Sequence, residues 1–99
     1  MKFGLSAQAE QLIQTVFQQY PEITWVQIFG SRALGNYRDN SDVDLVIRDN
    51  ISDELLRKII LEIGELPLPY LFDIVCYAQI SHAPFREHID HFAKDFYKV

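Results

Sequence analysis

The chain has 99 residues, which is enough for one compact domain and too few for two. Its formal net charge of −5 argues against broad nucleic-acid binding, which needs a cationic surface to neutralise phosphates. The single cysteine, Cys76, rules out an internal disulfide, and without a signal peptide or a membrane-spanning apolar run we expect one cytoplasmic domain over residues 1–99.

The first part of the chain predicts a helix followed by a strand. Ser6 can cap a helix that runs to about Gln19 and is ended by Pro21. Its apolar residues recur at helical spacing, namely Ala9, Leu12, Ile13, Val16 and Phe17. The segment Ile23 to Phe29 is dense in β-branched and aromatic residues and is therefore typical of a strand, which Gly30 ends.

The middle of the chain predicts a short turn, a second strand and a second long helix. Ser31 can cap a helical turn, and a polar loop covers Gly35 to Ser41. Val43 to Arg48 reads as a strand, Ser52 can cap the helix that follows, and Gly64 is its expected C-terminal cap. The expected buried face of this helix consists of Leu55, Leu56, Ile59, Ile60 and Ile63.

The last part predicts a third strand and a final helix. A proline-rich connector leads into a strand from Tyr70 to Tyr77, and a helix begins near Pro84. The expected apolar stripe of this helix is Phe85, Ile89, Phe92 and Phe96. The whole order is α-β-α-β-α-β-α, which predicts an α/β fold with a small three-stranded mixed sheet flanked by helices.

The connections between the strands predict how they pair. The second strand, the long helix and the third strand form a βαβ unit, so we expect a right-handed crossover and parallel strands. The first two strands are joined by a short segment, and we expect them to be adjacent and antiparallel. This arrangement brings Gly30 and Ser31 beside Asp42 at the start of the second strand.

Two aspartates at the start of the second strand are candidate metal ligands. Asp42 and Asp44 stand two residues apart, so both carboxylates project to one face while Val43 turns toward the core. Close carboxylates repel unless a cation binds between them, and Mg²⁺ prefers oxygen ligands. An isolated Asp-x-Asp pattern is more often only the solvated start of a strand, so the pair needs support from other residues.

Asp73 and the Gly30-Ser31 pair supply that support. Asp73 lies in an otherwise apolar and aromatic strand, where a carboxylate is costly unless it is paired, solvated or bound to a metal. In the βαβ unit Asp73 can lie alongside Asp42 and Asp44, although an aspartate facing solvent is the alternative. Gly30 permits close approach of a ligand to the backbone, and Ser31 can donate to a phosphate oxygen, although a plain turn would use the same residues.

Together these residues resemble the DNA polymerase beta-like nucleotidyltransferase superfamily, in which a strand, Gly-Ser, Asp-x-Asp and a later aspartate follow in this order. The chain looks like the minimal nucleotidyltransferases of that superfamily. These carry Gly-Ser-Arg-Ala-x-Gly and then Ser-Asp-x-Asp-Leu, here Gly30 to Gly35 and Ser41 to Leu45. Leu34 departs from the pattern, because many relatives carry a second arginine there.

The resemblance implies roles for individual residues. Asp42 and Asp44 should bridge two Mg²⁺ ions, and Asp73 should bind one of them and serve as general base if activation by the metal is not enough. Gly30 and Ser31 should hold the β and γ phosphates of ATP, the expected donor. Arg32 either neutralises charge on the pyrophosphate or is a surface residue, and the residues leave both readings open.

The resemblance also implies a biological setting. Relatives of this type are often encoded beside a small helical HEPN protein, and several resemble antitoxins that attach AMP to that partner. We therefore expect transfer of AMP from ATP to a hydroxyl of a HEPN-type partner, with no direct binding of nucleic acid or membrane. The alternatives are a catalytically silent subunit that binds a helical partner, a transferase acting on a small molecule or an RNA end, and self-association into a dimer.

Two other groups of polar residues give weaker signals. His88 and His91 share one side of the last predicted helix, and His82 precedes it, but no fourth ligand is near in sequence, so zinc binding is disfavoured. Tyr37 and Arg38 lie in the loop before Asp42, where a solvated position is favoured over contact with a base or a phosphate.

Overall fold

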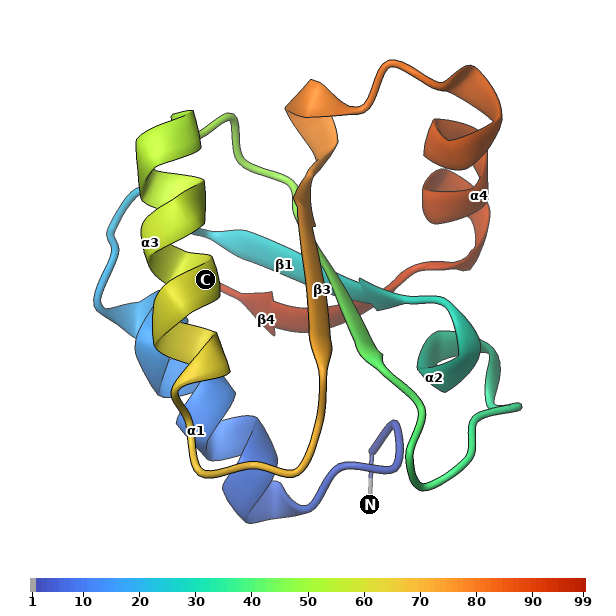
Figure 1. Cartoon of the computed structure of the whole chain (residues 1–99). Coiled ribbons are helices and arrows are strands. Elements are labelled where there is room, and N and C mark those ends of the chain that lie inside the picture. Colours follow the sequence, from blue (N-terminus) through green and yellow to red (C-terminus); the bar gives the residue numbers. More distant parts are fainter. Residues whose placement is uncertain (1) are drawn as a thin grey trace.

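Four strands form one mixed sheet, in the order β3-β2-β1-β4, in the computed structural model, which describes residues 2–99 (Figure 1). The strands are β1 (Trp25–Phe29), β2 (Val43–Ile47), β3 (Phe72–Cys76) and β4 (Lys94–Lys98). The antiparallel pairing of β1 with β2 and the parallel pairing of β2 with β3 confirm the predictions. The sheet has four strands and not three, because β4 pairs antiparallel with the other side of β1.

β4 takes the place of the predicted end of the last helix. That helix, α4, covers Ala83–Phe92 and stops because Ala93 adopts an extended conformation. Phe96 was predicted on the helical stripe, which is wrong: it is a buried residue of β4 that joins the main core. Phe92, the preceding residue of the predicted stripe, is 49% exposed. Residues four apart share one face of a helix and also one face of a strand, so the spacing alone could not separate the two structures.

Both long helices begin where the sequence predicts. The helical elements are α1 (Ala7–Gln18), α2 (Ser31–Leu34), α3 (Asp53–Gly64), the 3₁₀ turn η1 (Tyr77–Gln79) and α4. The Ser6 hydroxyl accepts a hydrogen bond from the Ala9 amide, and the Ser52 hydroxyl accepts one from the Leu55 amide, each 3.1 Å long. None of the helices within residues 2–99 has the length and apolarity that crossing a bilayer requires.

The end and the buried face of α3 differ from the predictions. Gly64 is the last helical residue and not the cap, because Glu65, which caps the helix, retains a right-handed helical conformation. Ile59 and Ile63 are fully buried, whereas Ile60 is 40% exposed and so does not belong to the buried face. A narrower apolar stripe therefore holds α3 on the sheet.

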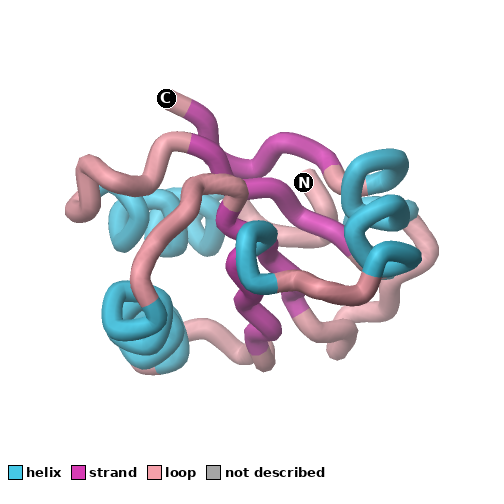
Figure 2. Tube along the Cα trace, turned by 90° about the horizontal axis from the view of Figure 1, so that it is seen from above, coloured by secondary structure: helices cyan, strands magenta, loops and turns pink. Residues whose placement is uncertain are grey.

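The sheet separates two hydrophobic clusters. In Figures 1 and 2 the long helices α1 and α3 lie on one side of the strands, and α2 and α4 lie on the other. The main core fills the side of α1 and α3, and a smaller cluster of Phe29, Val46 and Ile89 lies under α4. Alternating residues of β1, β2 and β3 contribute to the two clusters. In β2, Val43 and Leu45 face the main core, so Asp44 and Val46 face the other side.

Candidate active site

The three predicted carboxylates gather where β2 and β3 begin. Asp44 of β2 and Asp73 of β3 are direct partners in the parallel register. Asp42 comes immediately before β2 and shares the side-chain direction of Asp44, because residues two apart in an extended chain project alike. Asp44 is half-buried, whereas Asp42 and Asp73 are exposed. The face that carries them is the one opposite the main core, so Val43 turns away from them as predicted.

The surroundings of Asp44 raise its pKa to about 6. Burial of the carboxyl is the largest cause, and the negative charges of Asp73 and then Asp42 add to it, while the positive charge of Arg32 opposes the rise. At neutral pH Asp44 is therefore mostly ionised in spite of its acidic neighbours. A cation bound among these carboxylates would remove the repulsion.

The chemistry of these donors fits Mg²⁺, which prefers carboxylate oxygens and keeps positions for water and phosphate oxygens. As the side chains stand, no three His, Cys, Asp or Glu residues within residues 2–99 are grouped closely enough to hold a metal ion. Binding therefore requires the exposed carboxylates of Asp42 and Asp73 to rotate toward Asp44. Such rotations are open to exposed side chains, so the donor set fits although its geometry is not preformed.

The predicted phosphate-binding pair lies directly beside Asp44. Phe29, the last residue of β1, is the register partner of Asp44, and Gly30 follows it. Gly30 has φ of +73°, and a Cβ atom at this position would overlap the Asp44 carboxylate. Only glycine therefore allows the backbone to pass so close to this carboxylate. Ser31, the first residue of α2, is half-buried and follows this contact at once.

Arg32 is not a surface residue, so one of the two interpretations of this residue is wrong. Arg32 is only 2% exposed, and among residues 2–99 no other charged residue is buried. The guanidinium donates hydrogen bonds to the main-chain carbonyl oxygens of Phe3, Asp39 and Ser41. Sequence reasoning could not find these partners, since carbonyl acceptors leave no trace in residue type. Leu34, the position that departs from the family pattern, is 49% exposed on α2.

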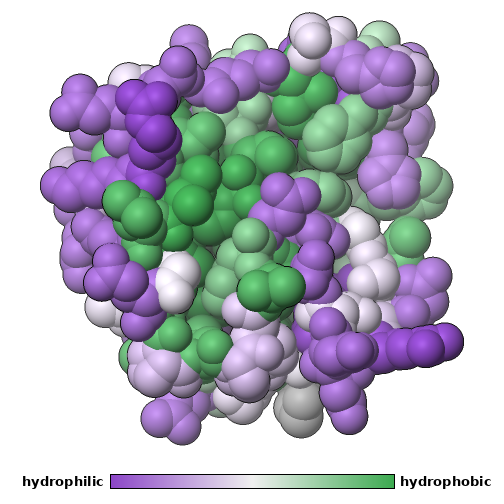
Figure 3. Space-filling model, viewed as in Figure 1, coloured by the Kyte–Doolittle hydropathy of each residue, from purple (hydrophilic) through white to green (hydrophobic). Residues whose placement is uncertain are grey.

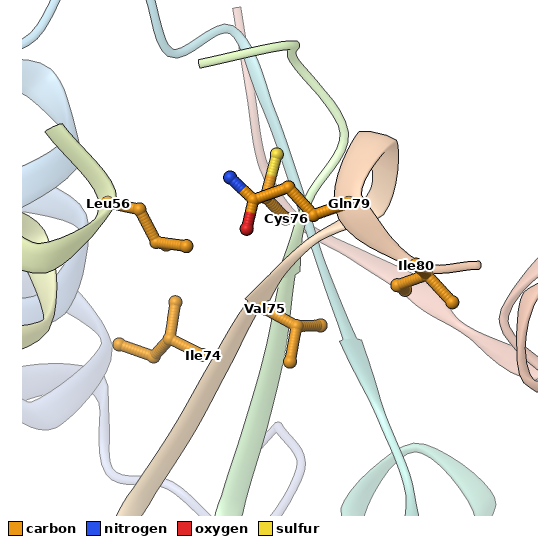
Figure 4. A pocket seen from close by; sticks show the side chains of 6 residues that line it. All are labelled: Leu56, Ile74, Val75, Cys76, Gln79 and Ile80. Atoms are coloured by element: carbon orange, nitrogen blue, oxygen red, sulfur yellow. The ribbon is translucent and has the colours of Figure 1, made fainter. Parts of the chain in front are cut away.

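An apolar hollow of about 280 Å³ lies along the other end of β3 (Figure 4). It is lined by Leu56, Ile74, Val75, Cys76, Gln79 and Ile80. Figure 3, which has the viewing direction of Figure 1, shows hydrophobic side chains gathered near the centre of this face of the molecule. No predicted site residue lines this hollow, so it is separate from the carboxylates at the start of β3.

A family model described as polymerase beta nucleotidyltransferase matches residues 11–98, which is most of the chain. The chain belongs to the polymerase beta nucleotidyltransferase family. No curated protein sequence matches it significantly. Membership of the nucleotidyltransferase family agrees with the fold, in which the Gly-Ser pair and the aspartates meet at one end of β1, β2 and β3.

Several solved structures of similar fold are toxin–antitoxin complexes. A toxin–antitoxin structure with AMP-PNP superposes with a TM-score of 0.73 at 18% identity, covering 91% of this nucleotidyltransferase and 73% of that chain. The MntA-HepT toxin–antitoxin gives 0.69 at 15% identity, covering 95% and 74%. A tri-AMPylated Shewanella oneidensis HEPN toxin in complex with its MNT antitoxin gives 0.68 at 15% identity, covering 93% and 71%. At these identities the likeness establishes the fold.

Proposed function

We propose that this nucleotidyltransferase transfers AMP from ATP to a hydroxyl of a HEPN-type partner protein, as the antitoxin of a toxin–antitoxin pair. The observation that carries the proposal is the register pairing of Asp44 with Asp73 directly beside Gly30. Family membership supports the reaction class. The acceptor and the nucleotide are suggested by two structures of similar fold, one with AMP-PNP and one with a tri-AMPylated HEPN toxin.

The proposed reaction is an in-line displacement at the α-phosphorus. The acceptor oxygen forms a new P–O bond, the bond to the bridging oxygen breaks, and pyrophosphate leaves with the electron pair. Two bound Mg²⁺ ions would neutralise phosphate charge and lower the pKa of the acceptor hydroxyl. Asp42 and Asp44 are the residues that would hold these ions, with Asp73 as the third proposed ligand.

The remaining roles follow from the positions of the side chains. Gly30 borders Asp44 and Ser31 follows it at the start of α2, so their amides and the Ser31 hydroxyl are the proposed donors to the β and γ phosphates. Asp73 is exposed and belongs to β3, which lies at the edge of the sheet formed by residues 2–99. We therefore propose Asp73 as the base that accepts the proton of the acceptor hydroxyl.

The proposal is tested by transfer of label. The protein is incubated with Mg²⁺, α-labelled ATP and the protein encoded beside it, together with an Asp42→Asn/Asp44→Asn variant. We expect label on the neighbour and a loss of at least about a hundredfold in the double variant. Asp53→Asn, an exposed aspartate of α3, is the matched control and should retain transfer.

Two other outcomes contradict the proposal in different ways. If the unmutated protein binds ATP in a metal-dependent manner but labels nothing, the proposed acceptor is wrong and a binding-only subunit becomes the better description. If the double variant binds ATP as tightly as the unmutated protein in the presence of Mg²⁺, the carboxylates are not the metal site. Competition by unlabelled GTP, CTP and UTP tests the choice of ATP.

A further inference from the structure

Arg32 is buried without a carboxylate partner. Among residues 2–99 the ion pair present is that of Arg48 with Asp90, and Arg32 forms none. Its acceptors are main-chain carbonyl oxygens: Nη1 donates to Phe3 at 2.9 Å, and Nη2 donates to Asp39 at 3.3 Å. Nε and Nη2 both donate to Ser41, at 3.2 and 2.9 Å. The planar guanidinium therefore uses its N–H groups to bind main-chain carbonyl oxygens.

Two tyrosine rings complete the surroundings of this guanidinium. The Arg32 Cζ atom lies 5.2 Å from the centre of the Tyr37 ring and 5.0 Å from the centre of the Tyr70 ring. Aromatic faces attract a cation and exclude water, so the rings favour the charged group in this buried position. Tyr70 lies just before β3, which means that Arg32 also contacts the segment leading to Asp73.

The segments that Arg32 joins are those that border the candidate site. Ser31 directly precedes Arg32, and Ser41, whose carbonyl accepts two of its hydrogen bonds, directly precedes Asp42. The loop that separates these two ends is polar and mostly exposed. The hydrogen bonds of Arg32 across the base of this loop add to the pairing of Phe29 with Asp44 in holding Asp42 relative to Ser31.

The N-terminal turn is held by the same guanidinium. The Phe3 carbonyl accepts a hydrogen bond from Arg32, and the adjacent Gly4 has φ of +71°. A Cβ atom on Gly4 would overlap the Tyr37 ring, so the turn packs tightly against the ring that covers Arg32. The turn thus contributes to the burial of Arg32, whose Nε, Nη1 and Nη2 atoms all donate to main-chain carbonyl oxygens.

We infer that Arg32 is a positioning residue that fixes Asp42 relative to Ser31, and is not a phosphate ligand. The inference rests on the proposed function for its catalytic consequence, because Asp42 and Ser31 are the proposed metal and phosphate contacts. Lysine has the charge but not the planar fork that binds three carbonyl groups at once. Arg32→Lys therefore keeps the positive charge and removes the set of hydrogen bonds to the three carbonyl groups.

The test compares Arg32→Lys with Ser31→Ala, and uses Arg57→Lys on the exposed face of α3 as the matched control. Mn²⁺ binding is measured without nucleotide, and amide hydrogen exchange is followed over residues 39–43. We expect Arg32→Lys to weaken Mn²⁺ binding by roughly tenfold and to speed exchange in this segment. Its kcat should fall at least about tenfold, while KM for ATP changes less than about threefold.

Ser31→Ala should show the opposite pattern, with a raised KM for ATP and unchanged Mn²⁺ binding. The inference is overturned if Arg32→Lys raises KM for ATP as Ser31→Ala does, with Mn²⁺ binding and exchange like those of the unmutated protein. If Arg32→Lys does not fold, Tyr70→Leu is used instead, because it removes one of the two rings that hold the Arg32 guanidinium and keeps the arginine. Unchanged exchange and Mn²⁺ binding in Tyr70→Leu would then count against the inference.

The first two readouts need no transfer reaction, so the two proposals fail separately. Suppose that the unmutated protein modifies no partner, while Arg32→Lys speeds exchange in residues 39–43 and weakens Mn²⁺ binding. This result would contradict the proposed function alone. If the Arg32→Lys variant labels its partner as well as the unmutated protein does, and exchanges as slowly, the positioning role alone is contradicted.

Discussion

Asp44, a proposed metal ligand, is placed at the expense of stability. Its pKa of about 6 in the folded protein exceeds the ordinary value of 3.8, so the folded state binds its proton more tightly than the unfolded state does. Between these two values the contribution of Asp44 to stability therefore falls as pH rises. At neutral pH without a divalent cation, the ionised carboxylate opposes folding.

We accordingly predict that Asp44→Asn stabilises the metal-free protein at pH 7.5. After allowance for solvent screening, the gain should be about 1 kcal/mol, which raises Tm by roughly 4–8 °C in a domain of this size. The gain should shrink below pH 6 and become small near pH 3.8, where the carboxyl is protonated in the folded state and half protonated in the unfolded state. Thermal unfolding in EDTA between pH 4 and pH 8 measures this. A gain that does not depend on pH would contradict the stated cause.

The residues of the site were predictable to different degrees. Asp42, Asp44 and Asp73 could be placed together from sequence, because strand alternation and βαβ topology are strong rules. Gly30 was found from the same topology. The burial of Arg32 could not be foreseen, since its acceptors are carbonyl groups of Phe3 and of the loop before Asp42, which only the folded chain brings together.

At the scale of elements, α4 and β4 show where local pattern fails. The stripe of aromatic and aliphatic residues continues from α4 into β4 at a spacing that fits either structure. A tertiary contact determines the structure of this segment, because β1 has a second edge with which Lys94–Lys98 pairs. The helices α1 and α3 and the pairing of the first three strands needed no such information, because caps, strand alternation and the connections between strands can be read from the sequence.

Two phenylalanines test this division of the chain. Phe96→Ala should cost about 3–4 kcal/mol, because Phe96 is buried at 7% exposure in the main core and its removal leaves a cavity. Phe92→Ala should cost less than about 1 kcal/mol, since half of that side chain is exposed on α4. Chemical denaturation of both variants provides the comparison. Equal losses would contradict the difference in burial between the two side chains.

For the whole molecule, the proposed metal site couples ligand binding to global stability. A cation that binds only the folded state stabilises it by about 2.7 kcal/mol at a hundred times its Kd. We predict that Mg²⁺ raises Tm in the unmutated protein and that EDTA reverses the rise. Asp42→Asn/Asp44→Asn should show no such response, and NaCl at equal ionic strength controls for screening of the net charge of −5. An equal rise in the double variant would place Mg²⁺ elsewhere.

The position of β1 inside the sheet has a consequence for synthesis on the ribosome. β1 lies between β2 and β4, and these partners are made at very different times, since β4 is the last element described. A nascent chain can pair β1 with β2 early, but the other edge of Trp25–Phe29 stays open until residues 94–98 emerge. An open apolar edge invites pairing with another chain. Release of an incomplete chain should therefore favour aggregation, and completion of the sheet should await the end of translation of this domain.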